Sequence, residues 1–339
     1  MLESSARNHQ LDALRGLAAL MVFFFHVTHG AGQWLDFNWG NTGVDLFFII
    51  SGYVIFLSVS KNATLKQFTK SRFIRLFPTY WFSATLTYLL IHLYFKLTSP
   101  DFAIFPFADY LINLTMLQHF FGIANIDQPY WTLAVELQFY FIIALLLASH
   151  RLKHIHYIAL IISVVSVLLR VFVSANAGYD YHRYFPFSEY SPLFFIGVLF
   201  YQRQQRAITN QLFFVMLALQ LIMQYFLFSS TGREIFVSHT EYALLLVFYI
   251  GLFFLLGLGK LSFLTIKPLL FLGEISYALY LTHQFITVNL LMPLCLEYFH
   301  LNFWLSAVLI TLPVCLLTAS FITYYVQYPA AAWLRKKLS

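Results

Sequence analysis

The chain has 339 residues, of which 60% are hydrophobic and only 10% are charged, and its mean hydropathy of +0.73 excludes a soluble globular protein. The net charge of +6 does not indicate nucleic-acid binding, because basic residues in a membrane protein are explained first by its topology. The two cysteines, Cys295 and Cys315, support neither a disulfide framework nor a thiolate metal site.

Ten apolar runs follow one another and predict an all-α, polytopic integral membrane helix bundle with about ten transmembrane helices. Most runs have the roughly 17–25 residues that a spanning helix needs. They are 11–29, 43–59, 77–97, 130–149, 155–174, 190–201, 211–228, 241–258, 270–292 and 303–325. No signal-peptide pattern precedes the first run. Because there is no internal repeat or linker, we expect one membrane domain over residues 1–339, with no appended soluble domain.

Basic residues recur in alternate gaps between these runs. They are Lys61, Lys66, Lys70, Arg72 and Arg75, then Arg151 and Lys153, Arg203 and Arg206, Lys260 and Lys267, and finally Arg335, Lys336 and Lys337. The positive-inside rule therefore places these gaps and both termini in the cytoplasm. Segment 107–121 is half apolar, but a crossing there would move the later basic gaps outside. We expect residues 98–129 to form an extracytoplasmic excursion with an interfacial or re-entrant helix.

Ionisable residues inside the apolar runs mark the candidate site, because charges in a membrane are costly and are usually functional. Arg15 and His26 are eleven residues apart, so on an α-helix they share nearly one face, with roughly 16 Å of rise between them. Asp45 in the second run and Glu136 in the fourth need a partner at that depth. Asp12 can pair locally with Arg15, three residues later.

Arg72 and Arg75 lie three residues apart at the start of the third run, on one face of a helix. Topology and attraction to anionic lipid headgroups would explain basic residues at this place. Two guanidinium groups on one face would also bind the phosphates of coenzyme A, because guanidinium binds phosphate oxygens bidentately. Both interpretations stay open at the level of sequence.

Four motifs stand in the order found in the acyltransferase-3 family, which residues 9–329 resemble. They are Arg15 and His26 followed by GVDLFFIISGY with Asp45 and Ser51; Arg72, Arg75, Pro78 and Tyr80; PYWTLAVELQFYF with Trp131 and Glu136; and LGEISYALYLTHQ with Tyr277 and His283. Thr132 takes the place of a family serine. The family often has Glu-Arg-Pro after the last span, where this chain has Gln327, Tyr328 and Pro329. A functional role for a charge at that site is therefore in doubt.

The resemblance implies a membrane-bound O-acyltransferase that moves an acyl group, acetyl by default, from cytoplasmic acyl-CoA to a hydroxyl of an extracytoplasmic carbohydrate such as a cell-surface polysaccharide. It implies acyl-CoA as co-substrate and a multi-pass protein of a bacterial inner membrane. No metal is expected, because a site of His26, His29 and Asp45 has no convincing further ligand in the sequence. Three sets of site residues follow. They are His26, Asp45 and Glu136 as catalytic; Arg15, Arg72, Arg75 and Tyr80 as cofactor-binding; and Asp12, Ser51, Trp131, Tyr277 and His283 as supporting residues.

Two questions of mechanism stay open in the sequence. His26 could be a general base oriented by Asp45 or Glu136, which we favour, or a nucleophile that forms an acyl-imidazole. A proton-coupled transporter or flippase of a glycan or small metabolite is the alternative function, since such bundles also carry buried His and Glu, although the hydropathy shows no repeat. Neither the acceptor nor the oligomeric state can be read from the sequence.

Overall fold

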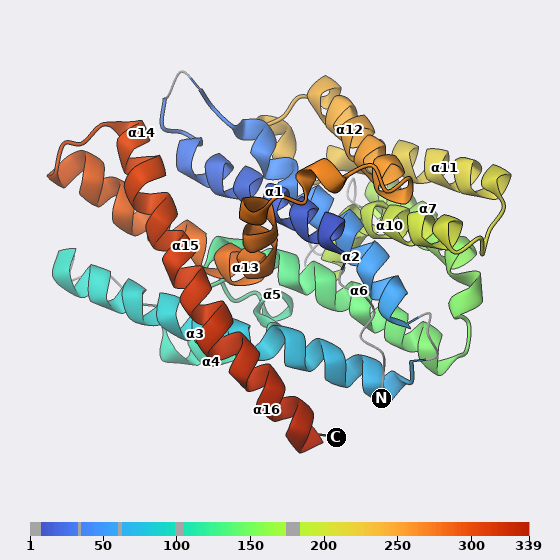
Figure 1. The fold of residues 1–339 in the computed structure, drawn as a ribbon, viewed down its shortest axis with the longest axis horizontal. Coiled ribbons are helices and arrows are strands. Elements are labelled where there is room, and N and C mark those ends of the chain that lie inside the picture. Colours follow the sequence, from blue (N-terminus) through green and yellow to red (C-terminus); the bar gives the residue numbers. More distant parts are fainter. Residues whose placement is uncertain (1–7, 33–34, 60–62, 99–104, 174–183, 339) are drawn as a thin grey trace.

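The chain folds into a bundle of long helices. The computed structural model describes residues 8–32, 35–59, 63–98, 105–173 and 184–338, and these ranges contain helices and no strand. Figure 1 shows the helices packed beside one another, with α13 next to α1 near the middle of the bundle. The chain is therefore an all-α, polytopic helix bundle, which confirms the predicted fold class.

Ten helical segments correspond to the ten predicted runs. They are α1 (His9–Thr28), α2 (Gly43–Val59), α3 (Leu65–Thr98), α6 (Trp131–Ala148), α7 (Ile155–Leu168) with η4 (Leu169–Val173), α10 (Ser191–Gln204), α11 (Asn210–Phe228), α12 (His239–Gly257), α13 (Lys267–Gln284) with η8 (Phe285–Leu291) and η9 (Leu294–Tyr298), and a last helix made of α14 (Phe303–Leu305), η10 (Ser306–Thr311), α15 (Leu312–Phe321), η11 (Ile322–Gln327) and α16 (Tyr328–Leu338). Eight of these segments, counted over the described residues, are long and apolar enough to cross a membrane. The chain is a multi-pass membrane protein.

The other two segments, α3 and α10, differ in length from an ordinary span. Helix α3 has 34 residues, or roughly 50 Å, so it extends past a hydrocarbon core of about 30 Å and carries its basic first turns outside it. Helix α10 has only 14 residues, or roughly 20 Å. Residues 191–202 of α10 are all buried, so this short helix is enclosed by its neighbours.

The segment that was expected not to cross is built from two short helices. Helix α4 (Phe107–Asn113) has 7 residues and α5 (Gln118–Phe121) has 4, so neither can span a bilayer. Two side chains of α3 fasten the segment: the Tyr80 hydroxyl donates to the carbonyl of Asn113 at 2.7 Å, and Trp81 Nε1 donates to the carbonyl of Leu114 at 2.9 Å. These lengths agree with the prediction that 107–121 does not cross, and the side on which the excursion lies stays a prediction; residues 99–104 lie outside the described residues.

Glycines let α1 approach its neighbour α13 closely. A Cβ atom on Gly273 would lie 1.9 Å from the carbonyl oxygen of Asp12, and one on Gly16 would lie 2.4 Å from the carbonyl oxygen of Leu269. Small residues at such crossings are the usual means by which membrane helices pack, because lipid provides no hydrophobic force between them. The contact holds the Arg15 turn of α1 against the start of α13.

We expect Gly273→Val to destabilise the bundle, because the new side chain would meet a backbone carbonyl that cannot rotate away. Overpacking of this kind costs about 1–3 kcal/mol. The thermal unfolding midpoint and the monodisperse fraction in detergent measure the effect. Gly251→Val is the matched control, since a Cβ at Gly251 in α12 meets nothing within 4 Å. Equal stability of the two variants would contradict this packing.

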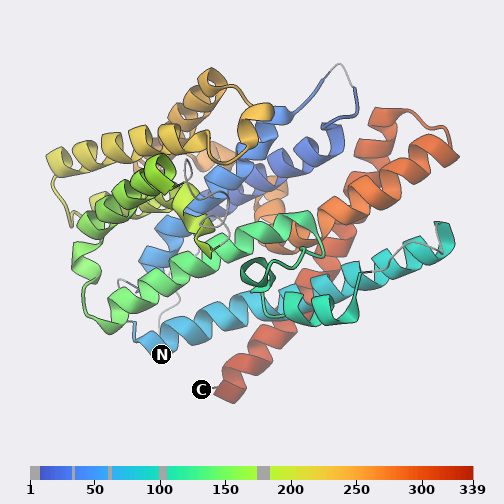
Figure 2. The same ribbon diagram turned by 180° about the vertical axis from the view of Figure 1, so that it is seen from behind.

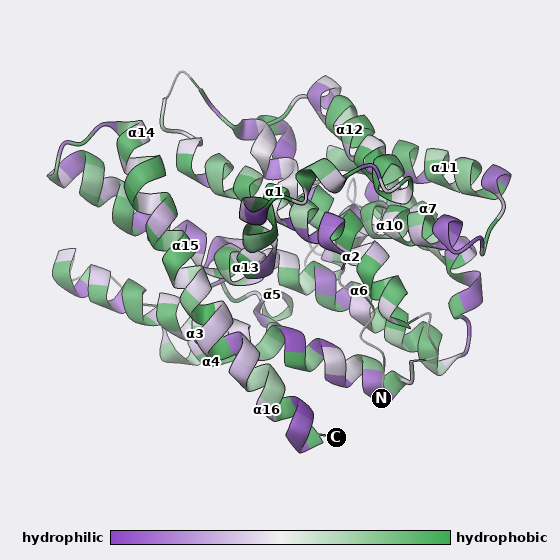
Figure 3. Ribbon diagram, in the orientation of Figure 1, coloured by the Kyte–Doolittle hydropathy of each residue, from purple (hydrophilic) through white to green (hydrophobic). Residues whose placement is uncertain are grey.

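Basic side chains gather at one end of the bundle. The last turn of α16 meets the first turns of α3 there, where the Lys70 ammonium donates to the carbonyl of Leu338. Figure 2 shows the tip of α16 and the start of α3 at the same end of the bundle, and Figure 3 shows hydrophilic residues at both, whereas the middle parts of most helices are hydrophobic. That this end faces the cytoplasm stays a prediction from the positive-inside rule.

Candidate active site

Three cavities lie in series through the bundle. The basic cavity, of about 810 Å³, is lined by Arg15, Arg72, Arg75 and Arg335, among others. The waist, of about 100 Å³, shares the first three of these arginines with it. The histidine cavity, of about 1420 Å³, is lined by His26, His29 and His119 and shares Val44 and Tyr280 with the waist. The waist therefore lies between two wider cavities and borders each of them.

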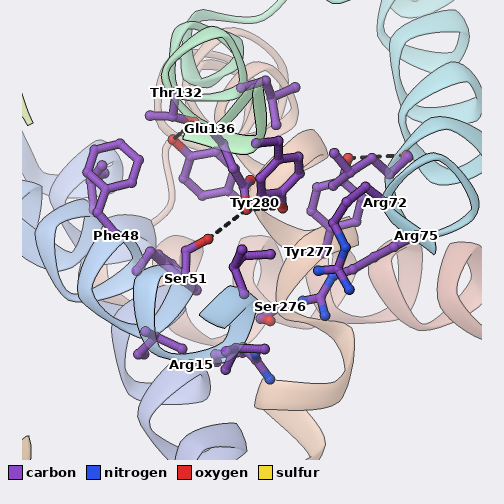
Figure 4. A pocket seen from close by; sticks show the side chains of 18 residues that line it. Arg15, Phe48, Ser51, Arg72, Arg75, Thr132, Glu136, Ser276, Tyr277 and Tyr280 are labelled. Carbon is purple, nitrogen blue, oxygen red and sulfur yellow. Dashed lines mark hydrogen bonds between the residues drawn. The ribbon is translucent and has the colours of Figure 1, made fainter. Parts of the chain in front are cut away.

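Three arginines from two helices meet where the basic cavity enters the waist. Arg15 comes from α1, and its Nη1 donates to Asp12 Oδ1 at 2.9 Å, as the spacing predicted. Arg72 and Arg75 come from successive turns of α3, and Figure 4 shows their guanidinium groups lying near each other. Arg72 also lies 5.9 Å from the ring centre of Tyr140. The sequence prediction that the two arginine motifs face one space agrees with this geometry.

Glu136 is the hydrogen-bonding centre of the waist. Its Oε1 accepts from the Ser51 hydroxyl at 2.9 Å and from the Tyr140 hydroxyl, and Figure 4 shows the bond from Ser51 crossing the waist. The wall beyond is aromatic, with Tyr277 donating to the carbonyl of Leu76 at 3.2 Å. A carboxylate at membrane depth needs such donors, because an unpaired charge there is costly.

His26 is half-buried and lines the histidine cavity from α1. Its ring centre lies 5.1 Å from that of His283, a buried side chain of α13. His29, one turn further along α1, is exposed and its Nδ1 lies 3.2 Å from Asn38 Oδ1. The chemistry available here is that of neutral imidazole, which can accept a proton from a hydroxyl or attack a carbonyl carbon. Within the described ranges, no three His, Cys, Asp or Glu side chains are grouped to hold a metal ion.

Comparison with known proteins identifies the class of this site. The chain matches the sequence model of the acyltransferase-3 family, described as an acyltransferase domain, over residues 8–324. The chain belongs to this family. The chain is thus a membrane acyltransferase, and the resemblance seen in the four motifs is confirmed.

Relatives of this acyltransferase include several named proteins. O-acetyltransferase OatA of Staphylococcus aureus (strain NCTC 8325 / PS 47) is 27% identical over 326 residues, which cover 82% of this chain and 50% of OatA. ORF330 of Acidianus two-tailed virus, a presumed acetyltransferase, is 25% identical over 291 residues, covering 81% of this chain and 82% of the viral protein. The chain thus spans about half the length of OatA. No solved structure matches it.

One predicted pairing in the acyltransferase is corrected by the structure. Asp45 was one of the two carboxylates, with Glu136, expected to orient His26, but it is fully buried and both of its carboxylate oxygens accept from Arg233, at 2.7 Å and 3.2 Å. The guanidinium also lies 5.2 Å from the ring centre of Tyr190. Because a buried bidentate pair satisfies both charges, Asp45 fastens the loop that carries Arg233 to the start of α2.

A second correction concerns Tyr80, which was expected to bind the cofactor. Its side chain is fully buried, its hydroxyl is bonded to the carbonyl of Asn113, and its ring lies 5.1 Å from that of Tyr130. Tyr80 is absent from the linings of the three cavities. It therefore anchors the α4 segment to α3 and does not reach the place where the arginines meet.

The supporting residues are divided between the cavities. Ser51 and Tyr277 line the waist, and Asp12 lies at the wall of the basic cavity. Trp131 lines the histidine cavity, with its ring 5.2 Å from that of Tyr190. The ring of His283 lies next to that of His26, with 5.1 Å between the ring centres.

Two site residues were missed by sequence reasoning. Arg233 lies in a polar loop, 188 positions from Asp45 along the chain. The only signal for it was that Asp45, a carboxylate in an apolar run, needs a cation as its partner. Asp127 precedes α6 and lines the histidine cavity; its Oδ2 accepts from the backbone N–H of Phe285 at 3.4 Å. Burial raises the pKa of Asp127 to about 7. Asp127 falls within the predicted excursion 98–129, and nothing in its local sequence signals burial.

Proposed function

We propose that this acyltransferase transfers an acyl group, acetyl by default, from cytoplasmic acyl-CoA to a hydroxyl of an extracytoplasmic carbohydrate, in the plasma membrane of a bacterium. The observation that carries the proposal is the row of adjacent cavities, with three arginines at one end and His26 at the other. The S. aureus relative is named an O-acetyltransferase, and this supports acetyl as the acyl group.

The arginines suit the phosphates of coenzyme A. Arg15, Arg72 and Arg75 project into one space, and guanidinium groups bind phosphate oxygens bidentately. The pantetheine arm is a thin chain on the order of 15–20 Å long, comparable with the roughly 16 Å of α1 between Arg15 and His26. Nucleotide phosphates in the basic cavity would then place the thioester near His26, with the arm in the waist.

The waist offers groups that complement this arm. Pantetheine carries two amides between apolar carbons, and the waist combines the Glu136 carboxylate and the Ser51 hydroxyl with the aromatic rings of Phe47, Tyr277 and Tyr280. With a volume of about 100 Å³ it is the smallest of the three cavities. Under this proposal only the acyl group and the arm enter the membrane, and the rest of coenzyme A stays at the basic end.

The reaction balances with His26 as general base. A sugar hydroxyl in the histidine cavity gives its proton to the neutral imidazole, and its oxygen attacks the thioester carbonyl carbon. The carbon–sulfur bond breaks, and the imidazolium returns the proton to the departing thiolate. The products are an O-acyl sugar and free coenzyme A, without net consumption of protons.

Mass spectrometry of surface glycans from cells with and without the gene tests this function. We expect O-acyl groups, seen as mass increments of acetyl, to be lost without the gene and restored by its return. Identical glycans in both strains, together with no release of coenzyme A by the purified protein, would contradict the proposal.

The row of adjacent cavities also suits a proton-coupled transporter or flippase of a glycan or small metabolite. The two functions differ in their products, because transport releases no coenzyme A. Purified protein in liposomes, given acetyl-CoA and sugar, separates them by a thiol assay. Solute uptake without thiol release would favour the transporter.

A further inference from the structure

The imidazole of His283 lies next to that of His26 and has no role in the chemistry described so far. His283, in α13, is 2% exposed. Its ring centre lies 5.1 Å from that of His26, with the two ring planes inclined at 52°. His283 also packs against two other rings, with ring-centre distances of 5.9 Å to Tyr280 and 6.5 Å to Phe23. The side chain is therefore fixed in position while facing the candidate base.

Backbone hydrogen bonds determine the tautomer of His283. Its Nδ1 lies 3.1 Å from the carbonyl oxygen of Leu279 and 3.0 Å from that of Tyr280. Carbonyl oxygens only accept, so Nδ1 carries the proton and donates it. In the neutral ring Nε2 then carries a lone pair and can only accept.

This lone pair is buried without a partner. Nε2 of His283 has no hydrogen-bond partner among the described residues, although it is shielded from solvent. A buried acceptor left unsatisfied is costly, so the arrangement calls for a donor. The nearest ring that can provide an N–H is His26. An imidazole nitrogen lies roughly 1 Å from its ring centre, so rings 5.1 Å apart can bring one nitrogen of each to about 3 Å.

We infer that His283 is the positioning residue for His26: its Nε2 accepts a hydrogen bond from one ring nitrogen of His26 when the site is loaded. The other nitrogen of His26 then presents its lone pair to the histidine cavity, where the acceptor hydroxyl arrives. This inference rests on the proposed function. It gives His283 the orienting role that was expected of Asp45 or Glu136; Asp45 is paired with Arg233, and Glu136 accepts from Ser51 and Tyr140.

The proton balance is unchanged by this role. His26 takes the proton of the acceptor hydroxyl and returns it to the thiolate, while the Nδ1 proton of His283 stays on its backbone carbonyls. A neutral partner stabilises the imidazolium less than a carboxylate would, so His26 gives its proton back more readily. His283 therefore fixes the tautomer of the base without trapping its proton.

Two amide substitutions separate this role from a purely structural one. In His283→Gln the longer side chain can place an amide oxygen near the position of Nε2, where it can accept from His26. In His283→Asn the shorter side chain can keep the donor to the backbone carbonyls but cannot reach His26. Positioning thus predicts that Gln is tolerated and Asn is not, whereas a structural role through Nδ1 predicts the reverse order.

The measurement is steady-state acetyl transfer from acetyl-CoA to a sugar acceptor, per mole of monodisperse protein. We expect His283→Asn to lower kcat by about 10- to 100-fold, as when an orienting partner is removed, with both KM values within about twofold of the parent. His283→Gln should retain most of the activity. Thr282→Val is the packing control, because Thr282 is equally buried and its hydroxyl donates only to the carbonyl of Ala278, at 2.9 Å.

Failure of this inference is distinguishable from failure of the proposed function. If the parent protein transfers acetyl groups and His283→Asn does so at an equal or higher rate than His283→Gln, the positioning role is wrong. An equal loss in both variants also overturns it, since an acceptor at the Nε2 position would then not suffice. If the parent protein releases no coenzyme A and acylates no acceptor, the proposed function fails first.

Discussion

His26→Ala is expected to reduce acyl transfer by about 10²- to 10⁴-fold, the contribution typical of a positioned general base. The variant should still insert and fold, because His26 is half-buried at the wall of a large cavity and lies about three helical turns from the close glycine packing of α1 on α13 at Gly16. Coenzyme A release from acetyl-CoA, measured with a thiol reagent in the presence of the acceptor, is the readout. The KM for acetyl-CoA should change little, since the phosphates bind at the other end.

His92→Ala is the matched control for this experiment. His92 is also a half-buried histidine in a long helix, with Nδ1 2.8 Å from the carbonyl of Tyr88, and it is absent from the linings of the three cavities. Near-normal transfer by a folded His26→Ala protein would remove His26 from the chemistry. The general-base and acyl-imidazole mechanisms are separated by incubating the protein with acetyl-CoA but no acceptor and quenching with acid. An acetylated His26 peptide in the mass spectrum would favour the acyl-imidazole.

The double variant Arg72→Gln, Arg75→Gln is expected to raise the KM for acetyl-CoA by about 10²-fold or more. Each hydrogen bond to a charged group contributes about 1.5–3 kcal/mol, and the two guanidinium groups are proposed to share the phosphates. The KM for the sugar acceptor should stay nearly constant, because that site lies beyond the waist. Initial rates over a range of each substrate measure both values.

Lipid attraction is the competing explanation of these arginines, and it predicts altered insertion with unchanged acyl-CoA affinity. The control is Arg151→Gln, Lys153→Gln, which removes the same charge from an exposed turn before α7, away from the three cavities. If both double variants insert normally and bind acetyl-CoA alike, the arginines serve the membrane surface and not the cofactor.

The sequence predicted the parts of this site that lie along one helix. The apolar runs predicted the ten helical segments. The regular geometry of the α-helix then placed Arg15 and His26 on nearly the same face without knowledge of any tertiary contact. The Arg72 and Arg75 pair was predictable for the same reason. Glu136 was expected to need donors, and one of them, Tyr140, lies one turn away on the same helix.

Contacts between distant segments could not be predicted in this way. Asp45 pairs with Arg233 across 188 positions, and nothing local distinguishes that arginine from other loop charges. Tyr80 completes a family motif, yet its hydroxyl serves a carbonyl in a segment 33 residues away. The proximity of His283 to His26 depends on the glycine contact between α1 and α13, which brings two remote helices together.

The central claim is that the acyl group alone crosses the membrane, from the basic cavity to the histidine cavity. Liposomes containing the protein, with the sugar acceptor trapped inside and radiolabelled acetyl-CoA added only outside, test it directly. We predict labelled acetyl sugar in the lumen and free coenzyme A outside, with no coenzyme A entering. Acetylation that occurs only when donor and acceptor share one side, or coenzyme A recovered in the lumen, would contradict the account.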